Sequence, residues 1–264
     1  MIEGYRRPAA NRLAFLDVKY PPWLSAASLA AAFAVWEAIA RAGFVSELFL
    51  PAPSGVLREG LEMLQSGEIF ANLAASLYRI LMGYAIGCAF GLAAGLVTGM
   101  SKLADITGTP IIYALYPVPK IALLPLIILW LGIGEISKIT VIALGVFFPV
   151  AINTWAGVKN VDPLFVKVAA SFRATRFSLV RKVILPGALP TIFAGLKLSA
   201  GTSLLMLVAA EMIAAQEGIG AMILHYGDLM LTTKLMVGVI ILSLLGLVFT
   251  NSLQFLEKKI VPWK

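Results

Sequence analysis

Six apolar stretches, each long enough to cross a lipid bilayer as a helix, dominate the 264-residue sequence. A membrane-crossing helix needs about 20 largely apolar residues. The predicted spans are residues 23–42, 73–100, 105–130, 136–157, 189–215 and 235–255. A soluble core could not hide so much apolar surface, because 60% of the residues are hydrophobic and only 13% are charged. The sequence therefore predicts an all-α, polytopic membrane protein with six transmembrane helices.

The basic residues lie in short segments between the spans, a pattern that sets topology and is not typical of a nucleic-acid-binding face. One side of the predicted topology, which holds both chain ends, carries Arg6, Arg7, Arg12, Lys19, Lys102, Lys159, Lys167, Arg173, Arg176, Arg181, Lys182, Lys258, Lys259 and Lys264. The other side carries Arg41, Arg58, Lys138 and Lys234. Because cytoplasmic loops are rich in Lys and Arg, we expect a bacterial inner-membrane protein with both termini cytoplasmic and no nucleic-acid partner.

This topology divides the chain into three parts. Residues 1–22 form a cytoplasmic N-terminal tail, residues 23–256 form the transmembrane domain, and residues 257–264 form a cytoplasmic C-terminal tail. Residues 44–69 are predicted to hold an amphipathic surface helix that Pro53 and Ser54 open. A loop that contains Glu217, Gly218, Gly220 and Asp228 follows the fifth span.

Glycine recurs every four residues in the second span, at Gly83, Gly87, Gly91, Gly95 and Gly99. In lipid, small residues on one face let another helix approach closely. We predict a close helix–helix contact on this face, either within one chain or between two chains.

The third span contains Pro110, Pro117, Pro119 and Pro125. Proline removes a backbone donor and disturbs the preceding turn. Such breaks are tolerated at membrane depth where protein or a water-filled cavity satisfies the freed carbonyls. We expect this span to line the translocation path, with kinks needed only for packing as the alternative.

The connection at residues 160–190 is much longer than a simple turn requires. Asp162 followed by Pro163 is a strong helix start, and Thr175 can cap a second short helix. Pro186 and Pro190 are predicted to end that helix and return the chain to the membrane. A capped helix–break–helix with apolar residues beside Arg and Lys is typical of a segment that docks a partner.

The same segment resembles the conserved cytoplasmic loop of ABC importer permeases, E-A-A, three residues, G, nine residues and I-x-L-P. Ala169, Leu185 and Pro186 match that pattern and Val183 is conservative, whereas Lys167 and Arg173 stand at its Glu and Gly positions. The stretches at residues 115–139, 147–163 and 209–223 are similar to the nitrate/sulfonate/taurine/bicarbonate branch of these permeases. The similarity covers about residues 20–260.

The resemblance implies a type I ABC importer permease that moves a small anion such as nitrate, sulfonate, taurine or bicarbonate. Its partners would be a second permease subunit (we expect a homodimer), a cytoplasmic ATPase dimer, and a periplasmic or lipid-anchored solute-binding protein, in membrane lipid. ATP and Mg would bind the ATPase, since this chain has no G-x-x-x-x-G-K-[ST] loop and we expect no cofactor on it. The implied ATPase-coupling residues are Lys167, Val168, Ala169, Phe172, Arg173, Ala174, Val183, Leu185 and Pro186.

Arg173 replaces a glycine that would permit a left-handed backbone. An arginine adopts that conformation at a cost of about 1–2 kcal/mol. Either the turn stays right-handed here, or Arg173 makes a compensating contact on the ATPase. With Lys167 at the Glu position as well, the partner surface is expected to be more acidic than usual.

Five charged residues lie within or near the ends of the spans: Glu37, Arg79, Lys120, Lys197 and Glu211. A charge inside the membrane needs a partner or water. For Arg79 and Lys197 we favour side chains that reach toward the interface. Glu211 lies deeper and is expected to line the path or to pair with a cation. The tentative path residues are Pro119, Lys120, Pro125 and Glu211.

Two other function classes compete with the permease hypothesis. An ion-coupled secondary transporter usually needs deep carboxylates, and the chain has few of these and no obvious duplicated halves. A membrane-embedded enzyme would need a cluster of catalytic residues, whereas His225 and Cys88 are isolated in the sequence. We therefore expect a transport subunit that is not itself an enzyme.

Overall fold

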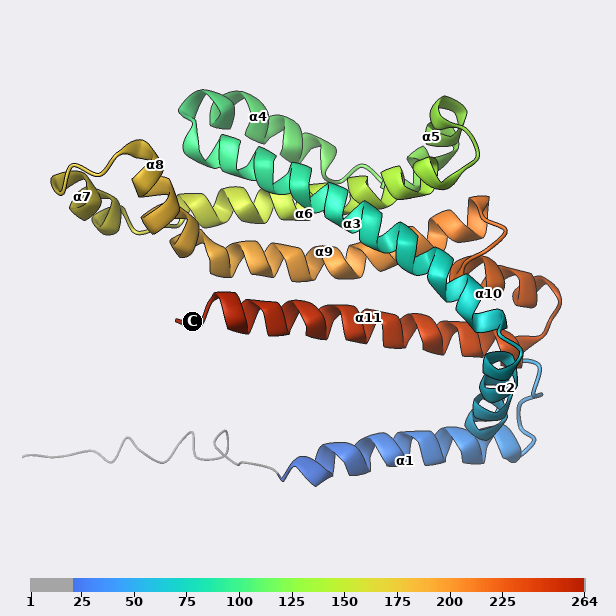
Figure 1. Cartoon of the computed structure of the whole chain (residues 1–264). Coiled ribbons are helices and arrows are strands. Elements are labelled where there is room, and N and C mark those ends of the chain that lie inside the picture. The colour runs from blue at the N-terminus through green and yellow to red at the C-terminus, as the bar shows by residue number, and fades with distance from the viewer. Residues whose placement is uncertain (1–20, 264) are drawn as a thin grey trace, which may run out of the picture. The chain divides into compact units, whose positions relative to one another are not determined.

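The computed structural model describes residues 21–263, and every regular element among these is a helix (Figure 1). The predicted all-α class is thus confirmed. The basic residues assigned to the N-terminal tail and Lys264 lie outside the described residues. The chain divides into two compact units, of which the second begins at Val56.

The first unit contains α1 (Pro22–Arg41) and the start of α2 (Pro53–Gln65). Glu37 in α1 accepts hydrogen bonds from the backbone N–H (3.0 Å) and hydroxyl (2.7 Å) of Ser54, and it also pairs with Arg41. A carboxylate at a helix N-terminus satisfies an orphan donor and complements the helix dipole. Glu37 therefore caps the surface helix that the sequence predicted.

The second unit contains the remaining helices. Their bounds are α3 Glu68–Met100, α4 Lys102–Leu115, η1 Lys120–Leu123, α5 Leu124–Leu131, α6 Glu135–Lys159, α7 Pro163–Ser171, α8 Arg176–Leu179, η2 Val180–Ile184, α9 Leu185–Ala214, α10 Ile219–Asp228 and α11 Thr232–Ile260. Four helices among the described residues are long and apolar enough to cross a membrane: α3, α6, the continuous run Arg176–Ala214, and α11. A fifth span results if α4 and the η1–α5 helix count as one broken span. The predicted count of six is confirmed only in part, because α1 matches the first predicted span in position but is not one of these.

The third predicted span is not a continuous helix. Its two halves, Lys102–Leu115 and Lys120–Leu131, are bent by 87° at the break between them. Pro117 and Pro119 both fall in this break, and Pro119 has an extended backbone. Two prolines this close together remove donors and forbid a continuous helix. Pro110 stays inside α4, and Pro125 lies in the first turn of α5.

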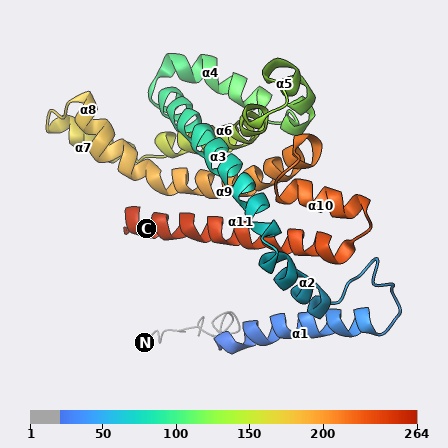
Figure 2. The same ribbon diagram turned by 45° about the vertical axis from the view of Figure 1, so that its right-hand side comes forward.

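The core of the second unit is built from α3, α6 and α9, with α6 packed between the other two (Figures 1 and 2). The glycine ladder of α3 lies against α6 of the same chain, which answers the question that the sequence left open. A Cβ at Gly87 would lie 2.6 Å from the Ala143 carbonyl oxygen, and one at Gly95 would lie 2.5 Å from Thr154 Cβ. Only glycine, whose side chain is a single hydrogen atom, lets the backbones of α3 and α6 approach this closely.

The start of the fifth span differs from the prediction at the prolines. Pro186 and Pro190 do not end the second short helix, because helical structure continues from Arg176 to Ala214. A π-helical turn at Val180–Ile184 precedes Pro186, which lies in the first turn of α9. A π-bulge changes the hydrogen-bond ladder locally, so it accommodates the missing donor and the ring of a proline just after it.

Two further boundaries are corrected in the connections. The segment after the fifth span, predicted as a loop, contains the helix α10 from Ile219 to Asp228. The C-terminal tail predicted from residue 257 is helical as far as Ile260. In α2, Leu57, Leu61 and Leu64 are exposed, while Val56 and Met63 are buried beside α10 and α11 residues.

Candidate functional site

Two regions at opposite ends of α6 and α9 carry the candidate functional side chains of the second unit. The coupling segment (residues 160–190) joins the end of α6 to the start of α9. Near the other end of these two helices lies a group that we call the buried ion cluster, made of Asn72, Ser76, Arg79, Glu135, Lys138 and Glu211, of which Asn72 and Glu135 are partly exposed. Figures 1 and 2 both place α7 and α8 at the end of the second unit away from α10.

Local capping builds the coupling segment as the sequence predicted. Asp162 Oδ1 accepts the backbone N–H of Leu164 (2.8 Å) at the start of α7, where Pro163 occupies the first turn. Thr175 Oγ1 accepts the backbone N–H of Ser178 (3.3 Å) at the start of α8. Each cap satisfies a donor that the helix itself leaves free.

The turn between α7 and α8 uses a left-handed residue, Arg173, with φ +53°. The Ala174 N–H donates to the Ala169 carbonyl (3.1 Å) and the Arg173 N–H to the Ala170 carbonyl (2.9 Å). These two bonds form a Schellman motif, which normally has glycine at the left-handed position. The first of the two alternatives for Arg173 is therefore wrong, because the turn is not right-handed.

The surface of the coupling segment combines apolar and basic side chains. Its exposed apolar residues are Leu164, Phe165, Val168, Phe172 and Phe177, of which Phe172 is 82% exposed. Its five cations, Lys167, Arg173, Arg176, Arg181 and Lys182, are all exposed. No acidic residue lies between Pro163 and Ile184, and none of the five cations forms an ion pair with a described residue.

The predicted coupling residues separate into two groups. Lys167, Val168, Phe172 and Arg173 are exposed, whereas Ala169, Ala174, Val183, Leu185 and Pro186 are half-buried. Leu185 packs beside the buried cluster of Val158, Ala188 and Ile192. Leu185 thus packs the start of α9 against the end of α6, and the first group faces outward.

Glu211 lies at the centre of the buried ion cluster and is fully buried. Its carboxylate accepts hydrogen bonds from the Ser76 hydroxyl (2.8 and 2.9 Å), from Arg79 Nη1 (2.7 Å) and from the Gly220 backbone N–H (2.8 Å). A buried carboxylate is tolerated when it is paired and fully hydrogen-bonded. Two roles were predicted for Glu211, and the structure shows the second, pairing with a cation, which is Arg79.

Arg79 joins three helices and one loop. Its Nε and Nη2 donate to the two carboxylate oxygens of Glu135 (2.6 and 2.8 Å), and its Nη1 also donates to the Glu217 carbonyl (2.5 Å). Lys138 pairs with Glu135 as well (2.9 Å). Arg79 is only 4% exposed, so the prediction that its side chain reaches toward the membrane interface is wrong. Lys197 likewise pairs with Glu257 (2.7 Å).

The cluster also supplies the N-terminal cap of α10. The Gly218 N–H donates to Asn72 Oδ1 (2.9 Å), the Ile219 N–H to Ser76 Oγ (2.9 Å), and the Gly220 N–H to Glu211. These are the donors that a helix start leaves free, and a carboxylate there also complements the helix dipole. Gly218 has φ +129°, and a Cβ on it would lie 2.5 Å from Glu211 Cδ, so the position requires glycine.

Asn72, Ser76, Glu135 and Lys138 were not singled out from the sequence. The available signal was the pair of opposite charges, Arg79 and Glu211, in separate apolar stretches. Charges inside a membrane protein need partners, so these two were candidates to pair with each other. The polar partners near helix starts carry no comparable signal, because Ser and Asn are common there.

The predicted path residues Pro119, Lys120 and Pro125 lie together at the bend after α4. Lys120 Nζ donates to the Leu115 carbonyl (3.3 Å) and to the Tyr116 carbonyl at the end of α4. It also lies 4.4 Å from the ring centroid of Phe148 in α6. A cation at a helix C-terminus binds the last carbonyls and complements the dipole. Lys120 therefore stabilises the bend, while Glu211 lies in the buried ion cluster.

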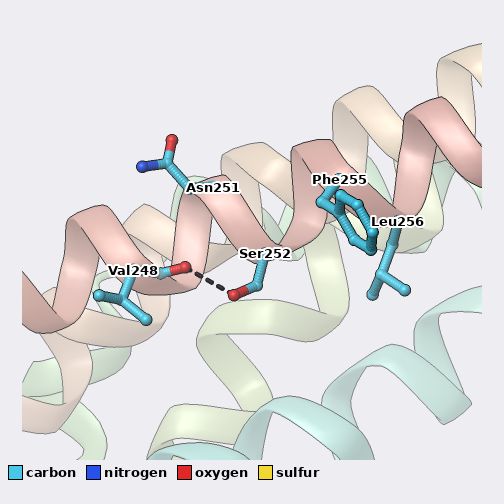
Figure 3. Close-up of a pocket in the computed structure, with 5 residues that line it drawn as sticks. All are labelled: Val248, Asn251, Ser252, Phe255 and Leu256. Atoms are coloured by element: carbon cyan, nitrogen blue, oxygen red, sulfur yellow. Dashed lines mark hydrogen bonds between the residues drawn. The ribbon is translucent and has the colours of Figure 1, made fainter.

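A shallow surface depression lies along α11 (Figure 3). It is lined by Val248, Asn251, Ser252, Phe255 and Leu256. The Ser252 hydroxyl donates to the Val248 carbonyl of its own helix (2.8 Å), and Asn251 points away from the apolar pair Phe255 and Leu256. The depression is open and its polar groups do not converge, so it lacks the features of a ligand site.

The model of the binding-protein-dependent transport system inner membrane component family matches residues 87–262. The chain belongs to this family. The permease is 38% identical over 231 residues to the putative aliphatic sulfonates transport permease SsuC of Bacillus subtilis, covering 88% of this chain and 84% of that one. It is 37% identical to the taurine transport system permease TauC of Escherichia coli, covering 91% and 89% of the two chains. The nitrate import permease NrtB of Leptolyngbya laminosa is 33% identical over 74% of this permease and 70% of its own length.

Solved structures of ABC importers share the fold of this permease. A chain of the inward-facing MetNI methionine ABC transporter matches with a TM-score of 0.61 at 19% identity, covering 75% of this chain and 96% of that one. A chain of an amino acid ABC transporter matches with a TM-score of 0.58 at 21% identity, covering 75% and 97%. The predicted type I importer architecture is confirmed, and the family favours an ABC permease over an ion-coupled secondary transporter.

Proposed function

We propose that this permease carries a small anion of the sulfonate, taurine, nitrate or bicarbonate kind into the cytoplasm, driven by a separate ATPase. The observation that carries the proposal is the coupling segment, two capped helices with exposed aromatic and basic side chains. Relatives named for aliphatic sulfonates, taurine and nitrate support the class of solute. ATP and Mg would bind the ATPase subunits.

We further propose the rest of the assembly from the family. A second copy of this chain completes the membrane domain, two ATPase subunits bind the coupling segments from the cytoplasm, and a periplasmic or lipid-anchored protein delivers the solute. Both termini then lie in the cytoplasm, and the buried ion cluster lies toward the outer side. The bend with Pro119, Lys120 and Pro125 borders the path, and a Lys120→Ala variant with an unchanged rate of anion uptake would contradict that part.

The ATPase surface that receives the coupling segment is proposed to be acidic. The segment presents five cations that form no ion pair with the residues that the structure describes, and it has no acid between Pro163 and Ile184. Two of the cations, Lys167 and Arg173, stand where the family pattern has Glu and Gly. Complementary charge accelerates association and makes it salt-dependent. Binding of the ATPase should therefore weaken as ionic strength rises.

Reconstitution in proteoliposomes with the ATPase and the binding protein tests the function. Uptake of taurine, ethanesulfonate or nitrate should require ATP and should stop in a Phe172→Ala variant that no longer retains the ATPase. Phe255→Ala is the matched control, because Phe255 is an exposed aromatic residue outside the coupling segment. Uptake by this chain without any ATPase, or retention of the ATPase by Phe172→Ala, would contradict the proposal.

A further inference from the structure

The buried ion cluster ties together four elements that approach one another at a single place. Asn72, Ser76 and Arg79 lie on α3, Glu135 and Lys138 on α6, Glu211 on α9, and the capped N–H groups on α10. The two acids and two bases of the cluster balance in charge. Such groups are costly at membrane depth unless they pair, so their presence on three separate helices calls for an explanation beyond burial.

The position of the cluster along α6 and α9 suggests its role. Glu135 and Lys138 lie in the first turn of α6, which runs to Lys159 just before the coupling segment. Glu211 lies in the last turn of α9, and the first residues of α9, from Leu185 to Pro190, belong to the coupling segment. A helix as long as α6 spans about 37 Å. The cluster and the coupling segment therefore hold opposite ends of the same antiparallel helix pair.

We propose that the buried ion cluster is a positioning element for transport, with Arg79 and Glu211 at its centre. It fixes the ends of α3, α6 and α9 together, so that a force applied to the coupling segment turns these helices as one body. Without the cluster the coupling end would move while the far ends of the helices separate or slide. This inference rests on the proposed function, in which the coupling segment receives that force.

Hydrogen-bond geometry distinguishes this fastening from apolar packing. Arg79 uses a bidentate fork on Glu135 and a third donor on Glu211, and bidentate pairs fix orientation as well as distance. The glycine ladder already packs α3 closely against α6, whereas Arg79 also binds Glu211 of α9 and the Glu217 carbonyl in the loop that follows α9. The directional ionic fastening therefore extends the fixed register from the α3–α6 pair to the end of α9.

Spin labels at Leu77 of α3 and Ile213 of α9 test the fastening directly. Both residues are exposed and lie near the cluster, and replacement of Cys88 removes the one native thiol. In full-length protein in nanodiscs, Glu211→Gln should broaden and lengthen the distance distribution between the labels. Where this variant fails to fold, the apolar replacement Arg79→Met with Glu211→Leu keeps a buried charge from being left unpaired and should give the same broadening.

The matched control is Lys197→Met with Glu257→Gln, which removes a different ion pair, between α9 and α11. It should leave the Leu77–Ile213 distribution unchanged. Unchanged distributions in both cluster variants would overturn the proposal, whether or not an ATPase binds the chain. Broadening in the control variant would overturn it as well, because any lost ion pair would then have the same effect.

The second measurement is solute uptake per ATP hydrolysed by the assembled transporter, with taurine, ethanesulfonate and nitrate as probes. Coupling between distant sites is typically worth 5–150-fold, and we expect the Glu211→Gln complex to lose about tenfold in this ratio while it still hydrolyses ATP. A purely structural role would lower the amount of complex and leave the ratio unchanged, which would overturn the proposal. ATP-independent uptake by the unaltered complex would instead contradict the proposed function. The distances between the spin labels would still show whether the ion cluster holds the ends of α3 and α9 together.

Discussion

The charged side chains of the buried ion cluster are paired, whereas the cations of the coupling segment are not paired with described residues. In the buried ion cluster, Glu211 is fully buried and Arg79 is 4% exposed, and each meets partners from other helices. In the coupling segment, cations such as Lys167 and Arg176 are exposed and form no ion pair with a described residue. One end satisfies its charges internally, and the other leaves them available.

This difference follows from what each end touches. A charge within the protein must be paired by the chain itself, because an unpaired buried charge is very costly. A charge in water costs little to leave unpaired, so it remains free to bind another protein. Internal pairing is therefore what a region that holds the fold requires, and exposed cations beside exposed aromatic residues are what the proposed contact with the ATPase requires.

The largest expected effect comes from removing one member of a buried pair. Arg79→Met should lower the free energy of unfolding by about 3–5 kcal/mol, because it leaves Glu211 buried without its cation. Thermal unfolding of the purified chain in detergent measures the change. Lys167→Met removes a cation from the coupling segment and is the control, with an expected change within about 0.5 kcal/mol. Equal effects of the two substitutions would remove the distinction between the two ends.

The glycine ladder allows a second comparison of a buried with an unconstrained position, through packing contacts instead of ion pairs. Gly95→Ala should lower the free energy of unfolding by about 1–3 kcal/mol, because the alanine Cβ would lie 2.5 Å from Thr154 Cβ in the adjacent helix. Gly201→Ala in α9 is the matched control, since a Cβ there meets nothing within 4 Å. It should stabilise the helix by up to about 1 kcal/mol. Unfolding midpoints that shift in the same direction for both variants would contradict the assigned contact.

Periodic and capping signals were sufficient to predict much of this fold. The spacing of Gly83 to Gly99 predicted a close helix contact, and Asp162 and Thr175 predicted both short helices of the coupling segment; all three expectations match the structure. These signals act within a few residues, where local chemistry decides the outcome.

Features that depend on distant partners were not predictable in the same way. The sequence shows that 132 positions separate Arg79 from Glu211, but it does not show that Arg79 Nη1 lies 2.7 Å from Glu211 Oε1. The effect of Pro186 depended on a π-helical turn before it, which no local pattern announces. Single-residue rules therefore gave wrong predictions where a π-helical turn compensated for Pro186 and where distant partners compensated for the charge of Arg79.

Replacing Arg173 tests whether its side chain binds the ATPase, which would explain why the left-handed position of the turn is not a glycine. Arg173→Gly should stabilise the isolated chain by about 1 kcal/mol, because glycine adopts the left-handed backbone without the steric cost that arginine has there. Met230→Gly is the matched control, since Met230 also has a positive φ (+58°) but lies outside the coupling segment. If Arg173 contacts the ATPase, Arg173→Gly alone should weaken ATPase binding in a pull-down. Unchanged binding would show that its side chain has no such contact.

The smallest expected effect on folding comes from reversing a charge in the coupling segment. Lys167→Glu restores the residue type of the family pattern at an exposed position, so the unfolding midpoint should stay within the shift that about 0.5 kcal/mol produces. Binding of an acidic ATPase surface should nevertheless weaken, and its dependence on salt should become shallower. Titration of the purified ATPase at two ionic strengths measures both. Tighter binding of Lys167→Glu would mean that the receiving surface is not acidic, and the unpaired charges would then need another partner.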